Sequence, residues 1–223
     1  RVTISPQKDE TRKTVNHLWQ HLEGYIQPPN SAPQPPMSAI PKPVRSLHRA
    51  VVCVYAIGKN QEIQLTGFAV DSRGFIVCTG HDLRSAQMVS LLLSDGREIE
   101  GVVVKIDPVR DLALLQASTA LDAVIPLRNG RFMLSNGDRL FAITCPFGGM
   151  ANIEPGFLDG PPRRVAGLPL WQVQMHIDPG SSGSPVFDRQ GRLVAIVKGR
   201  YRGTDSIGFL IPFETLLHFL EKY

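Results

Sequence analysis

Residues 178–185 read Asp-Pro-Gly-Ser-Ser-Gly-Ser-Pro and place a serine hydroxyl between glycines, just before an apolar pair. Gly180 and Gly183 allow the backbone to turn tightly and to approach a substrate closely. The amides of Gly180 and Ser182 could then point together at a developing oxyanion. Ser182 is therefore a candidate nucleophile, although clusters of Gly, Ser and Pro are mostly ordinary turns. The string alone leaves both interpretations open.

A serine nucleophile needs a base within hydrogen-bond reach, and the base needs a partner that fixes its tautomer. Of the six histidines, three lie before residue 50 and one lies in an apparent terminal helix, which leaves His81 and His176. His81 follows a predicted hairpin, where a lone histidine is more often structural. Asp111 enters an apolar strand directly and would be costly to bury without a partner, whereas Asp107 resembles a turn residue.

Six strings carry a resemblance to a known family. They read TGFAVDSRGFIVCTGH, LSDGRE, DPVRDLALL, NGD, PFG and DPGSSG, and they lie in this order between about residues 50 and 213. In content and order they resemble the chymotrypsin-like serine proteases, most closely the HtrA/Deg family. The resemblance implies an all-β fold of two six-stranded antiparallel barrels.

The resemblance also implies a role for each candidate residue. His81 would be the general base and acid, Asp111 would orient it, and Ser182 would be the nucleophile. The amides of Gly180 and Ser182 would form the oxyanion hole. The residues themselves agree with these roles, because each of the three lies at a turn or strand edge between apolar runs. The implied chemistry is acyl transfer from a peptide bond to Ser182, followed by hydrolysis.

The resemblance places His176, six residues before Ser182, at the wall or base of the primary specificity pocket. It could favour an acidic side chain before the scissile bond, or it could be a strand histidine satisfied by neighbouring backbone. Ile196, Val197 and Lys198 are predicted to pair with extended substrate backbone. The predicted protein is an endopeptidase that cleaves unfolded or exposed protein segments in protein quality control. The alternative is a protease-like scaffold that binds peptides without cleaving them.

The sequence departs from the family pattern at several places. Ser181 stands where the family usually has Asn and Ser184 where it usually has Gly, and both are small enough to keep the turn. No PDZ module follows the terminal helix, so we expect either an excised protease domain or recruitment of substrate by another segment. Residues 147–168, rich in Gly and Pro, are where a mobile activation loop is expected.

The composition of the chain limits the other functions it could have. Its 223 residues, 43% of them hydrophobic, are enough to bury one sizeable core or two barrels. The cysteines lack metal-ligand spacing, there is no Gly-rich phosphate loop, and no apolar run is long enough to cross a bilayer. We therefore predict no cofactor and no metal. Basic residues are scattered among acidic ones at a net charge of +4, which argues against a nucleic-acid partner.

The three cysteines are an odd number, so at least one thiol stays free or pairs between chains. All three are predicted to be small core residues. A Cys53–Cys78 disulfide is the alternative, because both residues lie in predicted strands of the first barrel. The chain opens at Arg1, from which we expect that a leader, a membrane anchor or more protein has been removed. The family resemblance favours an extracytoplasmic location, in a periplasm or secreted.

Residues 1–26 are the first predicted segment, an amphipathic helix with apolar residues at helical spacing: Val15, Leu18, Trp19, Leu22 and Ile26. The helix covers a patch of its own domain or contacts another subunit, and the resemblance makes a trimer the expected homo-oligomer. Residues 27–45 hold seven of the 18 prolines, which predicts an extended, fairly stiff linker.

Residues 46–223 are the predicted trypsin-like protease domain, with barrels at about 46–125 and 135–213. Short apolar runs bounded by turn residues predict strands at 51–56, 64–70, 75–79, 89–93, 98–104 and 112–116 in the first barrel. Those of the second barrel are predicted at 139–144, 156–157, 170–177, 184–187, 193–198 and 207–211. A short helix at 213–223 closes the chain.

Overall fold

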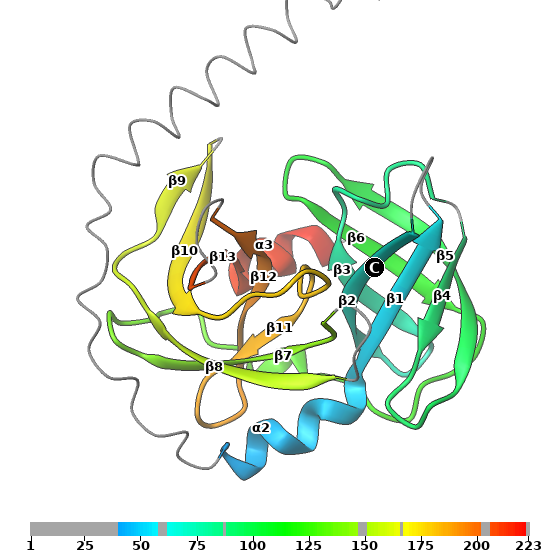
Figure 1. The fold of residues 1–223 in the computed structure, drawn as a ribbon, viewed down its shortest axis with the longest axis horizontal. Helices are drawn as coiled ribbons and strands as arrows, with labels where there is room; N and C mark the ends of the chain where they lie inside the picture. Colours follow the sequence, from blue (N-terminus) through cyan, green and yellow to red (C-terminus); the bar gives the residue numbers. More distant parts are fainter. Residues whose placement is uncertain are drawn as a thin grey trace, which may run out of the picture. The chain divides into compact units, whose positions relative to one another are not determined.

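A computed structural model of the chain describes residues 40–57, 62–86, 88–146, 151–165, 167–201 and 206–221. The chain divides into two units, Arg1–Ser38 and Ala39–Tyr223, and all described residues belong to the second. The predicted amphipathic helix at 1–26 and residues 27–39 of the predicted linker lie outside the described residues. Figure 1 shows the second unit as two β-barrels side by side.

The first barrel is a closed ring of antiparallel strands in the order β1-β2-β3-β6-β5-β4. Its strands are β1 (Val51–Ile57), β2 (Glu62–Asp71), β3 (Phe75–Thr79), β4 (Met88–Leu92), β5 (Glu98–Asp107) and β6 (Leu112–Ala117). Side chains alternate across each strand, so every second residue points into the barrel. Val52, Val54 and Leu65 are among those in its apolar core.

The second barrel is built from β7 (Arg139–Thr144), β8 (Asn152–Leu158), β10 (Leu168–Met175), β11 (Pro185–Phe187), β12 (Leu193–Arg200) and β13 (Ile207–Pro212). The strand order is β13-β12-β11-β7-β8-β10, and pairing of β10 with β13 closes the ring. All these pairings are antiparallel. The predicted fold of two six-stranded antiparallel barrels is therefore confirmed.

Two parts of the second barrel differ from the sequence prediction. β9 (Arg163–Val165), which forms a hairpin with β10, was not predicted. β8 is longer than the predicted strand at 156–157 and occupies much of the segment expected to be a mobile loop. Pro155 and Gly156 resemble turn residues, but both lie within β8. Glycine is required at 156, because an added Cβ would come 2.6 Å from the Gln174 carbonyl oxygen of the neighbouring β10.

Short helices flank the barrels. α2 (Lys42–Ser46) and the 3₁₀ turn η1 (Leu47–Ala50) precede β1, and the 3₁₀ turn η2 (Leu127–Asn129) lies between the barrels in sequence. α2 corrects the prediction of an extended linker up to residue 45. Its prolines lie at the start of the helix, where Pro is tolerated because its missing N–H has no helical partner, and Val44 is fully buried.

The predicted C-terminal helix is present as α3 (Phe213–Leu220), which is shorter than the expected 213–223. It buries Phe213, Leu216 and Phe219. The Lys105 ammonium of β5 donates a 2.7 Å hydrogen bond to the Phe219 carbonyl oxygen and lies 4.4 Å from the centre of that ring. α3 follows the second barrel in sequence, and its contact with Lys105 also attaches it to the first barrel. Among the described residues, no helix is long and apolar enough to cross a bilayer.

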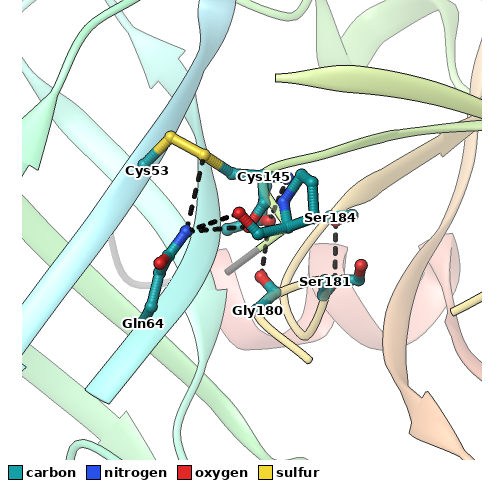
Figure 2. The surroundings of a disulfide bond; sticks show 8 residues. Cys53, Gln64, Cys145, Gly180, Ser181 and Ser184 are labelled. Atoms are coloured by element: carbon teal, nitrogen blue, oxygen red, sulfur yellow. Dashed lines mark hydrogen bonds between the residues drawn. A yellow bond between two sulfur atoms is a disulfide. The ribbon is translucent and has the colours of Figure 1, made fainter. Parts of the chain in front are cut away.

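The disulfide of the structure joins Cys53 to Cys145, with their Cα atoms 5.5 Å apart, and Cys78 is a buried free thiol. All three cysteines are buried, as predicted, but only Cys78 is a free thiol. The alternative of a Cys53–Cys78 disulfide is wrong. The reason is the alternation of side chains on the strands: Cys78 belongs to the core of the first barrel, whereas Val52 and Val54 occupy that core and turn Cys53 outward. Figure 2 shows this bond linking β1 to the residue that follows β7.

Candidate active site

Ser182 lies in the connection between β10 and β11, which turns through Gly180 (φ 93°) and Gly183 (φ 91°). A Cβ on Gly183 would come 2.1 Å from the Thr66 carbonyl oxygen, so this glycine allows the loop to lie directly on β2. The loop also bonds to itself, since the Ser184 hydroxyl donates to the Ser181 carbonyl oxygen at 2.7 Å. The serine at the family's usual glycine position therefore has a partner inside the turn.

The predicted oxyanion-hole amides are placed on this turn. Within the described residues, the amides of Gly180 and Ser182 donate no hydrogen bond, while the amide of Ser181 between them donates to the Asp178 carbonyl oxygen at 3.1 Å. The carbonyl oxygens of Gly180 and Ser182 accept hydrogen bonds from Thr66, at 2.8 Å from its hydroxyl and 2.9 Å from its amide. The turn thus uses the Ser181 amide as a donor and leaves the amides of Gly180 and Ser182 without an acceptor among the described residues.

His81 and Asp111 are brought together by two tight connections. His81 follows the end of β3, and Asp111 ends the turn between β5 and β6 with φ 59°, the one positive value among non-glycine residues in the described ranges. The Asp111 carbonyl oxygen accepts from the Gly80 amide at 3.2 Å, which joins the two connections. His81 Nδ1 lies 3.0 Å from each carboxylate oxygen of Asp111. The predicted pairing of base and carboxylate is present in the structure.

The pKa values of this pair favour the charged forms. Burial alone would raise the pKa of Asp111, which is 5% exposed, but hydrogen bonds from His81 and Lys198 outweigh it and hold this pKa below its usual value. Hydrogen bonds to Asp111 and then to Asp82 raise the pKa of His81 to about 9. His81 is therefore predominantly an imidazolium at neutral pH in this arrangement.

The second ring nitrogen of His81 does not contact Ser182. His81 Nε2 lies 3.2 Å from the Asp82 carboxylate, and the Ser182 hydroxyl makes no hydrogen bond with any described residue. Ser182 Oγ instead lies beside β12, 4.0 Å from the position that a Cβ on Gly199 would occupy. The structure thus joins His81 Nδ1 to Asp111 and His81 Nε2 to Asp82, and it places Ser182 beside Gly199 of β12.

Comparison with known proteins shows the family of the chain. The model of the trypsin-like peptidase domain matches residues 65–196, more than half of the chain. The chain belongs to the trypsin-like peptidase family. Within that family it is homologous to the DegP/HtrA serine proteases. A probable periplasmic DegP-like serine endoprotease of Ectopseudomonas mendocina is 29% identical over 174 residues, which cover 74% of this chain and 36% of the relative.

Other relatives and solved structures give the same result. Protease Do-like 1 of Arabidopsis thaliana, a chloroplastic protein, is 30% identical over 68% of this chain and 37% of its own length. The HtrA-type protease AlgW with tripeptide matches with a TM-score of 0.73 at 26% identity, covering 80% of this chain and 61% of AlgW. A serine endoprotease from Yersinia pestis has the same TM-score and identity, over 85% and 67%. The chain spans about a third of the length of the curated relatives it matches.

The Lys198 side chain makes a contact that was not predicted from the sequence. Its ammonium donates to the carboxylate oxygen Oδ2 of Asp111, the oxygen that also faces His81. Ile196 and Val197 are fully buried. The Val197 amide donates to Ser184, and its carbonyl oxygen accepts from Gly183, both at 2.8 Å. The backbone groups of Val197 are therefore not available to a substrate strand.

His176, the candidate specificity residue, lies just beyond the end of β10 with half of its side chain exposed. Its Nε2 is 2.9 Å from a carboxylate oxygen of Asp178, so it is partnered within its own segment. Glu154 lies within electrostatic range, and burial raises the pKa of that carboxyl while the His176 charge opposes the rise. His176 thus belongs to a small charged cluster before the Ser182 turn.

Sequence reasoning missed Asp82, Thr66 and the contact of Lys198 with Asp111. Asp82 directly follows the candidate base, and a carboxylate at that place was a readable signal. The roles of Thr66 and Lys198 depend on contacts over 114 and 87 residues of sequence, which no local pattern reveals. In the described ranges, no group of His, Cys, Asp and Glu is arranged to hold a metal ion.

Proposed function

We propose that the chain is a serine endopeptidase of HtrA/Deg type, in which Ser182, His81 and Asp111 form the catalytic triad. The observation that carries this proposal is the contact of His81 Nδ1 with the buried Asp111 carboxylate, because it leaves Nε2 as the nitrogen that can accept a proton. Membership of the trypsin-like peptidase family and relatives named as serine endoproteases support it.

In the proposed reaction, Ser182 Oγ attacks the carbonyl carbon of a peptide bond while His81 Nε2 takes the hydroxyl proton. Asp111 holds the imidazole and stabilises the imidazolium that forms. The amides of Gly180 and Ser182 stabilise the negative charge on the carbonyl oxygen. His81 then returns the proton to the leaving amine, and a water molecule hydrolyses the ester of Ser182 by the same steps.

The first step requires His81 to be neutral and to turn its Nε2 from Asp82 to Ser182. Catalytic hydrogen bonds are often long or misaligned before a substrate binds, so the present arrangement fits a resting state. A substrate that displaces the Asp82 carboxylate would both free Nε2 and remove a charge that favours the imidazolium. Asp82 in this proposal is the group that holds the base inactive until substrate arrives.

The substrate is proposed to be an unfolded or exposed segment of another protein. The HtrA-type relative AlgW has been solved with a tripeptide, and we extend peptide binding to this chain. His176 is the proposed specificity residue for the side chain before the scissile bond, and its ring would bind an acidic side chain in competition with Asp178. Cleavage of a peptide library by wild type and His176→Ala tests this preference, since an unchanged profile would reject the role.

A non-catalytic, peptide-binding scaffold is the second candidate function. It is favoured by one observation, the engagement of His81 Nε2 by Asp82 with the Ser182 hydroxyl unbonded within the described residues. The two candidates differ in one respect that is simple to measure, because a scaffold binds unfolded protein and releases it intact.

An extracytoplasmic location is proposed for the protein. Disulfides persist in oxidising compartments, and the Cys53–Cys145 bond is buried within the domain. DegP-like relatives are named as periplasmic. The proposed oligomer is a trimer that forms through residues 1–26. Light scattering before and after deletion of residues 1–39 tests it, and an unchanged number of subunits would reject a role of this segment in assembly.

The catalytic proposal is tested by cleavage of fluorescently labelled, unfolded β-casein. Wild type should release labelled peptides, and Ser182→Ala and His81→Ala should each be inactive while keeping their far-ultraviolet circular dichroism. The matched control is Ser94→Ala, an exposed serine in a turn of the first barrel. Equal activity in wild type and both active-site variants would contradict the assignment, and intact casein bound to wild type would favour the scaffold.

A further inference from the structure

We propose that Thr66, held in place through Cys145 and its disulfide, is a positioning residue for the oxyanion hole. This inference rests on the proposed function, because it concerns how Gly180 and Ser182 are oriented for acyl transfer. It assigns to a buried threonine of the first barrel a role in the chemistry of a loop from the second.

Thr66 contacts both residues that supply the oxyanion-hole amides. It lies on β2 with no exposed surface. Its hydroxyl donates to the Gly180 carbonyl oxygen at 2.8 Å, and its amide donates to the Ser182 carbonyl oxygen at 2.9 Å. These bonds fix the planes of the peptides 180–181 and 182–183. Each oxyanion-hole amide belongs to the peptide directly before a fixed one, 179–180 or 181–182, so Thr66 limits how both amides can turn. The amides of Gly180 and Ser182 are left without acceptors among the described residues.

The Thr66 hydroxyl is itself oriented by the second barrel. It accepts a 2.8 Å hydrogen bond from the Cys145 amide, which occupies a lone pair and directs the hydroxyl proton toward Gly180. A hydroxyl with one donor and one acceptor partner has a single favourable orientation. The position of the Cys145 amide therefore determines how well Thr66 can hold the loop.

Cys145 is held by three neighbouring residues of the first barrel. Its sulfur is bonded to Cys53, which lies directly opposite Thr66 in the pairing of β1 with β2. Its amide is bound by Thr66, and its carbonyl oxygen accepts from the Gln64 amide group at 3.1 Å. The same Gln64 nitrogen donates to Pro146 at 3.0 Å. Cys53, Gln64 and Thr66 lie on one face of these two strands because alternate side chains share a face.

Figure 2 shows this arrangement, with Gln64 reaching toward the disulfide and Gly180 and Ser181 on the far side of Cys145. A continuous path therefore runs from the disulfide through the Cys145 amide and the Thr66 hydroxyl to the Gly180 carbonyl oxygen. All of its side chains are at least nine-tenths buried, so water does not substitute for the protein bonds. The path predicts that loss of the hydroxyl or of the disulfide lowers catalysis without removing any group that touches substrate.

The experiment compares wild type with Thr66→Val, which keeps the shape and loses the hydroxyl, and Thr66→Ser, which restores it. Rates of casein cleavage at several concentrations give kcat and KM, and the rate of inactivation by a fluorophosphonate gives the reactivity of Ser182. Thr215→Val, a buried threonine of α3, is the matched control. Circular dichroism and the thermal midpoint show whether each variant is folded.

We expect Thr66→Val to lower kcat roughly 10- to 100-fold, less than the ~10²–10³-fold cost of deleting an oxyanion donor outright. KM should hardly change, because the lost interaction acts in the transition state. Thr66→Ser should restore most of kcat. The double variant Cys53→Ala/Cys145→Ala should also lower kcat. Adding Thr66→Val to this double variant should lower kcat by a smaller factor than Thr66→Val does in wild type, because both changes act on the same path.

A folded Thr66→Val variant with wild-type kcat overturns the proposal, and so does a loss that Thr66→Ser fails to restore. If Thr66→Val does not fold, the Cys53→Ala/Cys145→Ala variant decides, and a wild-type kcat there overturns it. Failure of the proposed function looks different. Wild type itself would then neither cleave casein nor react with the fluorophosphonate, and this inference would fall with the function.

Discussion

Asp111 combines a left-handed backbone conformation, burial and a shared carboxylate. Asp is among the few residues that adopt positive φ readily, and such conformations gather at functional sites. Its carboxylate contacts both His81 and Lys198, so two cations share one negative charge. His81 in turn is shared between two carboxylates, Asp111 and Asp82. The protonation of His81 is thus set by three charged residues, by Asp82 and Asp111 directly and by Lys198 through Asp111.

Asp82→Asn should shift the pH dependence of activity. A general base must be neutral, so activity should rise with pH through the His81 pKa of about 9. Replacing Asp82 by Asn removes a negative charge that favours the imidazolium, and this pKa falls. The acid limb of the kcat/KM profile should therefore move to lower pH by roughly one unit. Asp95→Asn, at an exposed turn aspartate, should leave the limb in place, and an unmoved limb in Asp82→Asn would refute this role.

Lys198→Met should have the opposite effect on the same profile. Without the ammonium, the Asp111 carboxylate interacts with His81 alone and stabilises the imidazolium more strongly, so the acid limb should move to higher pH. The buried carboxylate also loses a charged partner, which should lower the free energy of unfolding by roughly 1–3 kcal/mol. Urea denaturation and the pH profile measure the two effects. An acid limb that does not move, or that moves to lower pH, would contradict the sharing of the Asp111 carboxylate. The control is Lys42→Met, at an exposed site.

At the scale of residues, the need of a serine nucleophile for a base and a carboxylate left both His81 and His176 as candidate bases. The family resemblance then selected His81 and paired it with Asp111. The same reasoning could not find Thr66, whose bonds to Gly180 and Cys145 exist only after both barrels have folded. Nor could it show that the Lys198 side chain reaches Asp111.

At the scale of elements, the connection from β10 to β11 is fixed by its contact with β2. Gly183 allows the loop to approach β2 this closely, and both its positive φ and the lack of space around it require glycine. The neighbouring Gly180 shares the positive φ. The sequence pattern of glycines around a serine therefore reports close packing between two barrels as well as a tight turn.

Gly183→Ala should destabilise the protein more than an alanine at another left-handed glycine. The added methyl group would lie 2.1 Å from the Thr66 carbonyl oxygen, so the loop must move off β2. Gly96 has a similar φ of 86° with nothing within 4 Å of an added Cβ, and Gly96→Ala should cost only about 1 kcal/mol for the backbone strain. Thermal unfolding measures the difference. Equal losses in the two variants would contradict the close approach.

The strands could be predicted because apolar alternation and turn residues are local signals. The strands at 75–79 and 139–144 were predicted with the bounds that the structure has. β9 and the full length of β8 could not be predicted, since Pro155 and Gly156 interrupt the apolar pattern and tertiary pairing overrides them. α2 was missed because prolines that exclude most helices are tolerated in the first turn.

At the scale of the whole molecule, the two barrels are joined by more than the chain that runs between them. The Cys53–Cys145 disulfide closes a sequence separation of 92 residues, and Lys105 connects the first barrel to α3. The sequence could not give the disulfide pairing, because the choice among three cysteines depends on which face of its strand each one occupies. In the described part of the chain, the two barrels are therefore joined by a covalent bond between Cys53 and Cys145 and by the Lys105 contact with α3.

Reduction of this disulfide should lower stability markedly. Cross-linking across 92 residues removes chain entropy from the unfolded state, and its loss should cost about 4 kcal/mol. A phosphine reductant added under partly denaturing conditions should lower the thermal midpoint of wild type. The Cys53→Ala/Cys145→Ala variant should already have the lower midpoint and should not respond to the reductant. A response in that variant, or none in wild type, would contradict the assigned pairing.

The central claim is that Ser182 is an activated nucleophile in a competent oxyanion hole. The most direct measurement is reaction with a fluorophosphonate, with and without unfolded casein, and location of the adduct by peptide mass spectrometry. We predict one adduct at Ser182 that forms faster at pH 9 than at pH 7 and is absent in Ser182→Ala. No adduct on Ser182 under any of these conditions, in a protein shown to be folded, would contradict the claim and leave the peptide-binding scaffold as the function.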